Sequence, residues 1–213
     1  MMNTFGIVNF GLFCVAVLLL NATPGPDTAY IIGRSVAQGR AAGMVSALGI
    51  SVGCLFHSVA SAFGLTAIIA TSATAFMLVK MAGGAYLIYL GIRMVMTKPI
   101  RPTESPVLQD NRSLPKIFWQ AVLTNILNPK VVLFFLSFFP QFVSTDTEHK
   151  TTAFLLLGAT FVIMSTIWNS GTAFLAGTLA RRAGRNPHIK LWLERVVGSA
   201  FVALGIKLAF SKN

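Results

Sequence analysis

Long uncharged hydrophobic stretches, separated by short basic segments, dominate the chain. No Asp, Glu, Lys or Arg occurs in residues 1–26, 41–79 or 151–180. About 20 apolar residues cross a bilayer as one helix, so residues 41–79 are too long for one span and are expected to turn near residues 71–74. The pattern predicts an all-α integral membrane protein with six transmembrane helices, over residues 5–34, 43–69, 75–97, 117–143, 152–178 and 191–210.

Proline residues interrupt the first and the fourth of these predicted spans. The first interruption contains Asn21, Pro24, Gly25, Pro26 and Asp27, and the second contains Asn125, Asn128, Pro129 and Lys130. Breaks at membrane depth are tolerated only where they are buried in protein or line a cavity. A matched pair of breaks in the two halves of a chain indicates the binding site of a transporter.

An internal repeat divides the chain into two units. Residues 84–98 and 198–212 both carry an initial Gly, a Leu-Gly-Ile-basic segment and a final hydroxyl residue followed by Lys. We therefore expect a first three-helix repeat over residues 1–98, a connector over residues 99–116 and a second repeat over residues 117–213, all in one membrane domain (1–213). Because three spans are an odd number, the repeats are inverted relative to each other.

The net charge of +11 follows the predicted loops, while only 11% of the residues are charged. Arg34 and Arg40 flank the first connection, and basic residues also gather at the third and fifth connections. Lys and Arg accumulate on the cytoplasmic side of a membrane, so both termini are predicted outside. This distribution indicates topology and contact with anionic lipids rather than nucleic-acid binding. The uncharged first segment lacks the basic start and the cleavage pattern of a signal peptide.

The interruptions place two helix starts near the middle of the membrane. Proline is favoured as a first helical residue, and Asn128 is a strong N-cap for the helix that Pro129 begins, while Gly25 precedes Pro26 at the other start. Such starts present positive dipole ends to an anion. Asp27 and Lys130 follow the two prolines, so we expect Asp27 to face a substrate ammonium or a proton and Lys130 to face a carboxylate. The alternative is that Asp27 merely stabilises the N-terminus of its helix and pairs with Lys130.

Other polar and small residues within the spans carry weaker expectations. His57 is a candidate for proton coupling, although a satisfied core histidine is the more common case. Trp168, beside Asn169, is a candidate pocket wall. Small residues such as Gly49, Gly53 and Gly64 are expected to permit close helix contact. The cysteines Cys14 and Cys54 indicate neither a disulfide nor a metal site, and no cofactor is expected.

The motifs together resemble the LysE/RhtB amino-acid exporters over essentially the whole chain. The resemblance rests on residues 21–27, 80–92, 125–130 and 139–142 and on the Gly49, Gly53 and His57 spacing. It implies a multi-pass protein of the bacterial inner membrane that is not an enzyme and has no catalytic residues. It also implies export of an amino acid or related metabolite of the homoserine, threonine, leucine and lysine class, by proton antiport with alternating access.

Two alternatives and one open question accompany this interpretation. A metal-cation exporter would need several carboxylate, His or Cys ligands within the spans, and Asp27, His57 and two scattered cysteines are the whole supply. A membrane-embedded enzyme would need a paired acid and base, which is absent from the spans. The substrate is not fixed by the sequence, and assembly into a homo-oligomer stays open.

Overall fold

The computed structural model describes residues 5–71, 113–144 and 146–176, together with nine isolated positions between residues 74 and 199. Within these residues all the regular elements are helices, joined by short turns, and the one β-type pairing is an isolated antiparallel bridge between Ile7 and Val143. The predicted spans over residues 75–97 and 191–210, the connector, the repeat segments 84–98 and 198–212, and most of the turn at residues 71–74 lie outside the described residues. The fold class is therefore confirmed as all-helical, and the arrangement of six spans stays a prediction.

The first helical region is interrupted at Pro24 and Pro26, as the sequence predicts. Helix α1 covers Phe10–Ala22 and α2 covers Pro26–Thr71, with Thr23, Pro24 and Gly25 between them. Helix α2 is not straight, because Gly39 has φ 84° and ψ 178° and folds it into a short first arm and a long second arm. Gly43 lies against Ser35 across this fold. A positive φ of this size is readily available only to glycine. The predicted connection between spans one and two is thus reduced to a sharp turn.

The second region repeats this design with different bounds. Helix α4 covers Leu114–Ile126, α5 covers Pro129–Ser137, and a 3-10 turn η2 follows over Phe139–Phe142. The chain bends by 48° where α4 meets α5. Helix α6 covers Lys150–Leu175 and agrees closely with the predicted fifth span.

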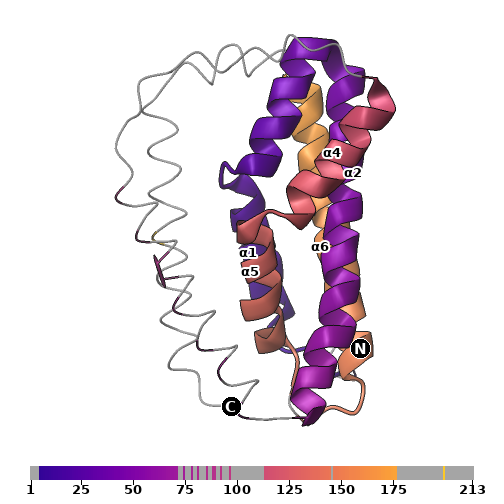
Figure 1. Cartoon of the computed structure of the whole chain (residues 1–213). Helices are drawn as coiled ribbons and strands as arrows, with labels where there is room; N and C mark the ends of the chain where they lie inside the picture. Colours follow the sequence, from indigo (N-terminus) through magenta and orange to yellow (C-terminus); the bar gives the residue numbers. More distant parts are fainter. Residues whose placement is uncertain are drawn as a thin grey trace.

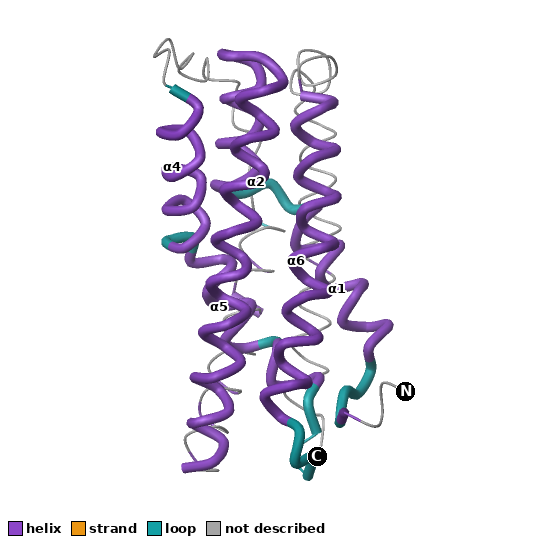
Figure 2. Tube along the Cα trace, turned by 90° about the vertical axis from the view of Figure 1, so that its right-hand side faces the viewer, coloured by secondary structure: helices purple, strands orange, loops and turns teal. Residues whose placement is uncertain are grey.

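The two breaks lie near the middle of the bundle's height (Figures 1 and 2). Helices α1 and α5 occupy one half of the bundle, and α4 and the first arm of α2 occupy the other half. The chain passes through the two breaks in opposite directions, since α1 leads up to the first break in Figure 1 and α5 leads down from the second. The end of α1 therefore meets the start of α5, and the start of α2 meets the end of α4.

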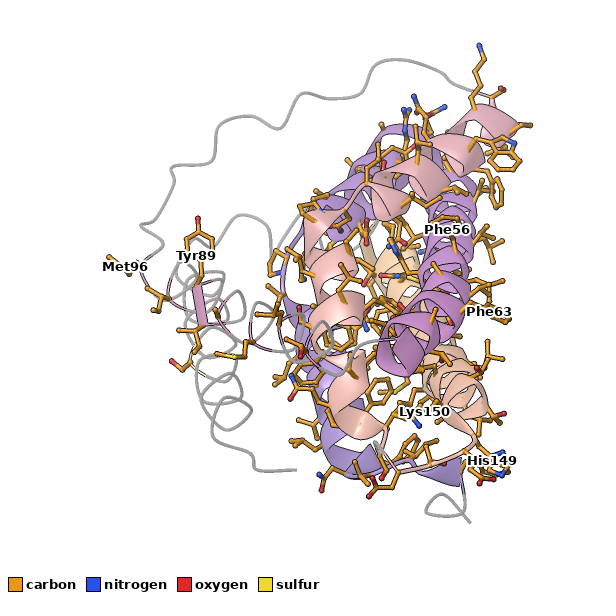
Figure 3. The ribbon with its side chains drawn as sticks, turned by 60° about the horizontal axis from the view of Figure 1, so that its bottom comes forward. Phe56, Phe63, Tyr89, Met96, His149 and Lys150 are labelled. Atoms are coloured by element: carbon orange, nitrogen blue, oxygen red, sulfur yellow. The ribbon has the colours of Figure 1, made fainter. Side chains whose placement is uncertain are left out.

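The outer surface of the helices is apolar enough for a bilayer. Pro26–Ala67 and Lys150–Leu175 are each long and apolar enough to cross a membrane, and the bent pair α4 and α5 adds a third candidate. Phe56 and Phe63 lie on the outer side of α2 and point away from its neighbours (Figure 3), with 54% and 62% of their surfaces exposed. A large apolar surface of this kind is stable against lipid rather than water.

The interior is built from close helix contacts and from aromatic rings. At Gly49 an added Cβ would lie 2.5 Å from the carbonyl oxygen of Phe118, so α2 and α4 touch there as expected. At Gly64 no atom of the described residues lies within 4 Å of such a Cβ, so close contact there stays a prediction. In the half that holds α1 and α5, rings from α1, α5, η2 and α6 pack together; this aromatic cluster consists of Phe13, Phe134, Phe135, Phe138, Phe139, Phe142 and Phe161.

Candidate functional site

A small cavity lies between the two breaks and the inner faces of α2 and α6. Its volume of about 30 Å³ is room for about two water molecules. The hydrophobic part of its wall includes Leu20, Ile50 and Phe161. Its polar part comes from both breaks and from α6: Asn21, Asp27, Thr28, Asn128, Lys130, Ser165 and Asn169.

Asp27 lies in the first turn of α2, where the helix dipole favours a negative charge. Its Oδ2 atom accepts a hydrogen bond of 2.7 Å from Nδ2 of Asn125, at the end of α4. Its Oδ1 atom is buried and has no hydrogen-bond partner among the described residues. The carboxylate therefore keeps one acceptor atom without a partner among the described residues, in a residue that lines the cavity.

Lys130 lies in the first turn of α5 and reaches across to the end of α1. Its Nζ atom donates to the carbonyl oxygen of Leu20 at 2.7 Å and to that of Thr23 at 2.8 Å. These carbonyls belong to a helix end that lacks partners within its own helix. The ammonium group therefore caps the C-terminus of α1 and keeps one of its three donor positions unused by the described residues. In the described chain Asp27 and Lys130 hydrogen-bond to other partners and form no ion pair with each other, so the alternative of direct pairing is not seen in this structure.

The N-terminus of α5 is capped as the sequence predicts. The side chain of Asn128 accepts from the backbone N–H of Lys130 at 3.1 Å, and its carbonyl accepts from those of Val131 and Val132 at 3.0 and 3.1 Å. The first N–H groups of α5 are thus already used, contrary to the expectation that they are free for a ligand. At α2 the carbonyl of Gly25 accepts from Ala29 at 2.9 Å.

His57 is buried on the second arm of α2 and does not line the cavity. Its Nε2 atom lies 3.2 Å from the carbonyl oxygen of Asn125, and its ring stacks on Phe135 with the centroids 5.6 Å apart. His57 therefore completes the hydrogen bonding at the end of α4, much as Lys130 does at the end of α1. This environment fits a core histidine.

The remaining predicted site residues lie around the same break. Asn21 donates to Ser165 and lines the cavity, while Pro24 and Pro26 are exposed at the break itself. Pro129 begins α5 and is also exposed. The prolines thus shape the two breaks and do not belong to the cavity wall.

Two polar residues of α6 reach the cavity although the sequence did not single them out. Ser165 and Asn169 line it with 2% and 5% of their surfaces exposed. Trp168, the predicted pocket wall, is instead 38% exposed and does not line the cavity. The spacing of four residues between Ser165 and Asn169 would have placed both on one helix face.

A buried arginine joins the first arm of α2 to α4, on the other side of the breaks from the aromatic cluster. Arg34 is 1% exposed and donates to the side chains of Gln38 at 2.8 Å and Gln120 at 3.3 Å. Its guanidinium lies 5.5 Å from the ring of Tyr30, whose hydroxyl donates to the carbonyl of Ile117. The sequence assigned Arg34 to the edge of a loop, so its burial was missed.

The described residues contain no group of three or more His, Cys, Asp or Glu side chains that could hold a metal ion. Within these ranges the metal-exporter alternative therefore lacks a ligand set. Neither the cavity nor its surroundings contain a second carboxylate beside Asp27 among the described lining residues.

Comparison with known proteins identifies the family. The family model of LysE type translocators matches residues 18–212. An uncharacterised membrane protein of Pseudomonas aeruginosa is 30% identical over 211 residues, covering 98% of both chains. A leucine efflux protein of Salmonella typhimurium is 26% identical over 212 residues, again covering 98% of both chains. No solved structure matches the chain. The chain belongs to the LysE type translocator family, and it is a membrane transporter rather than an enzyme.

Proposed function

We propose that the protein exports an amino acid through the cavity between the two breaks. The observation that carries this proposal is the open Oδ1 atom of Asp27, buried at a cavity that the ammonium of Lys130 also lines. A buried carboxylate oxygen without a partner costs free energy unless a ligand supplies a donor. The ammonium group of an amino acid is such a donor.

The opposite end of a zwitterion has partners on the same side of the cavity. Helix α2 begins here without the internal cap that α5 has, and among the described residues its Asp27 and Thr28 N–H groups have no acceptor. Together with the unused donor position of Lys130 they form a site for a carboxylate, because helix N-termini favour anions. A zwitterion therefore satisfies both kinds of open group at once.

Proton antiport follows from the same carboxylate. Asp27 can hold the substrate ammonium or a proton on Oδ1, and the two exclude each other. A carrier that must exchange one for the other couples export to proton entry. His57 lies behind Asn125, away from the cavity, and takes the supporting role.

The cavity volume supports an occluded state between two access states. Room for about two water molecules is too little for any amino acid, so transport needs the surrounding helices to separate. The aromatic cluster lies on one side of the breaks and the Arg34 contacts lie on the other. We propose that six spans in two inverted repeats rock about the breaks, as in other secondary transporters. The opposite chain directions at the two breaks support this.

The proposed orientation rests on the distribution of basic residues, and the proposed substrate class rests on the relatives of the protein. The basic connections support an orientation in the bacterial inner membrane with both termini on the outer side. The relatives named as leucine efflux proteins support an amino acid as cargo. The proposal also includes anionic lipids, which would contact the basic loops. It allows a homo-oligomer as well.

Proteoliposomes containing the purified protein test the proposal. Leucine, threonine, homoserine and lysine would be supplied as labelled substrates with and without a pH gradient. We expect gradient-dependent flux of at least one of them, and a loss of at least about 100-fold in Asp27→Asn, as for loss of a charged partner in a buried site. Glu148→Gln, at an exposed loop position, serves as the matched control. Unchanged flux and unchanged gradient dependence in Asp27→Asn would contradict the role of Asp27.

A further inference from the structure

The cavity has a second polar wall, which carries no charge. Ser165 and Asn169 come from α6, one helical turn apart, and both are almost fully buried. No Asp, Glu, Lys or Arg occurs between residues 151 and 180. This wall therefore differs in chemistry from the Asp27 and Lys130 side.

The hydrogen bonding of α6 singles out these two residues. The hydroxyls of Thr160, Thr166 and Thr172 donate to the carbonyl four residues back, at 2.9, 2.7 and 3.0 Å. Ser165 does not do so; its Oγ atom accepts from Nδ2 of Asn21 at 3.0 Å, and among the described residues it has no acceptor for its own proton. The amide of Asn169 has no hydrogen bond to any residue in the part of the chain that the structure describes.

An unpartnered amide in a buried position needs a partner from beyond the described part of the chain. Nearly all buried polar groups in proteins are hydrogen-bonded, either to protein or to ordered water. Two water molecules fit the cavity and can hydrogen-bond to Asn169 there. When the substrate replaces that water, the substrate must offer equivalent hydrogen bonds or leave the amide unpaired.

The charged groups of the substrate have binding partners other than Ser165 and Asn169. On the proposed function, the ammonium binds Asp27 and the carboxylate binds the start of α2 and Lys130. The rest of the cavity wall is apolar, with Leu20, Ile50, Val131 and Phe161. Ser165 and Asn169 are therefore left for the side chain of the substrate.

We propose that Ser165 and Asn169 bind a hydroxyl group on the substrate side chain and so determine specificity. This inference rests on the proposed function. The hydroxyl donates to Oδ1 of Asn169 and accepts from the hydroxyl of Ser165, so one group supplies a partner to each of the two residues. The transporter then prefers a small hydroxyl amino acid to an aliphatic amino acid of the same shape.

Threonine and valine are the matched probes, because they differ by a hydroxyl in place of a methyl group. Uptake of each would be measured in proteoliposomes with the wild type, Asn169→Leu and Thr160→Val. We expect the wild type to favour threonine by about tenfold or more, since a site built around a hydroxyl rejects the analogue that leaves its polar groups unpaired. Asn169→Leu should bring the ratio close to one. Thr160→Val, which removes a hydroxyl of α6 away from the cavity, should keep the wild-type ratio.

Each other outcome has a definite meaning. A wild type that carries valine as well as threonine, or an Asn169→Leu variant that keeps the wild-type ratio, overturns the inference and leaves amino-acid export intact. Flux of neither probe nor of any other amino acid in the wild type contradicts the proposed function instead. Where Asn169→Leu carries neither probe, Ser165→Ala decides, because it must also lower the ratio of threonine to valine uptake if the pair acts together.

Discussion

At the first break, the end of α1 exposes carbonyl groups and receives the ammonium of Lys130 from the other half of the chain. At the second break, the end of α4 exposes the carbonyl of Asn125 and receives the ring of His57. At both breaks, therefore, a side chain that is distant in the sequence donates a hydrogen bond to a backbone carbonyl at a helix end. They differ in what remains open, because Lys130 already makes two hydrogen bonds while Asp27 leaves one oxygen without a partner.

This difference separates two charges that occupy equivalent positions in the sequence. Lys130 mainly stabilises the fold, since its removal leaves the carbonyl of Thr23 without this donor and the carbonyl of Leu20 with only the 3.3 Å hydrogen bond from the N–H of Thr23. On the proposed function Asp27 serves a ligand instead, and its Oδ1 atom makes no hydrogen bond to the described chain. Stability and transport should therefore respond differently to substitutions at the two breaks.

The largest stability effect is expected for Lys130→Met. It should lower the free energy of unfolding by about 3 kcal/mol, because two charge-assisted hydrogen bonds are lost and their acceptors stay buried. Denaturant unfolding in detergent micelles, followed by circular dichroism, measures this. Lys150→Met is the control, since Lys150 donates only to the carbonyl of Thr147 near an exposed loop. Equal losses for both variants would remove the distinction between the charges.

A methyl group added at each break should give the next largest contrast. A Cβ at Gly53 would lie 2.5 Å from Oδ1 and 2.7 Å from Cβ of Asn125, whereas one at Gly25 would meet Lys130 atoms at 3.6 Å. Gly53→Ala should therefore cost about 2 kcal/mol of stability, as overpacking does. Because it displaces Asn125 from Asp27, it should also impair transport, and Gly25→Ala should change stability by less than about 0.5 kcal/mol. Similar unfolding midpoints for the two variants would show that the second break is less tightly packed than described.

The cap of α5 should contribute less than either contact. Asn128→Ala removes the side chain that accepts from the N–H of Lys130 and should lower stability by about 1 kcal/mol. Ser113 is the N-cap of α4 and makes no such side-chain hydrogen bond. Ser113→Ala should therefore leave the unfolding midpoint unchanged, and an equal shift in both variants would argue against a specific cap at the second break.

The smallest effect is expected at His57. His57→Gln can keep a donor toward the carbonyl of Asn125, so stability should fall by less than about 1 kcal/mol. The ratio of transport with and without a pH gradient should stay at the wild-type value, because His57 does not line the cavity. A gradient dependence lost in His57→Gln but kept in Asp27→Asn would reverse the assignment of the coupling residue.

The positions of the breaks could be predicted from the sequence, but the partners of the charges could not. Proline fixes where a helix begins, and Asn128 before Pro129 is a cap that local chemistry determines. The acceptors of Lys130 are backbone carbonyls 107 and 110 residues away, and every residue carries a carbonyl, so no sequence signal marks them.

The second polar wall escaped prediction for a different reason. A membrane helix is apolar toward lipid as well as toward protein, so the apolar pattern of α6 does not indicate which face is buried. Trp168 was therefore as plausible a wall residue as its neighbour Asn169. Arg34 was misassigned because its burial depends on Gln120, which belongs to the other half of the chain.

The hydrogen bond from Lys130 to Thr23 also orders events during synthesis. The ribosome makes the donor 107 residues after the acceptor, which takes roughly 5–20 s at about 5–20 residues per second. Throughout that interval the end of α1 lacks the ammonium that closes it. A chain that stops before residue 130 lacks this donor, so it cannot make the hydrogen bond that joins the end of α1 to the start of α5.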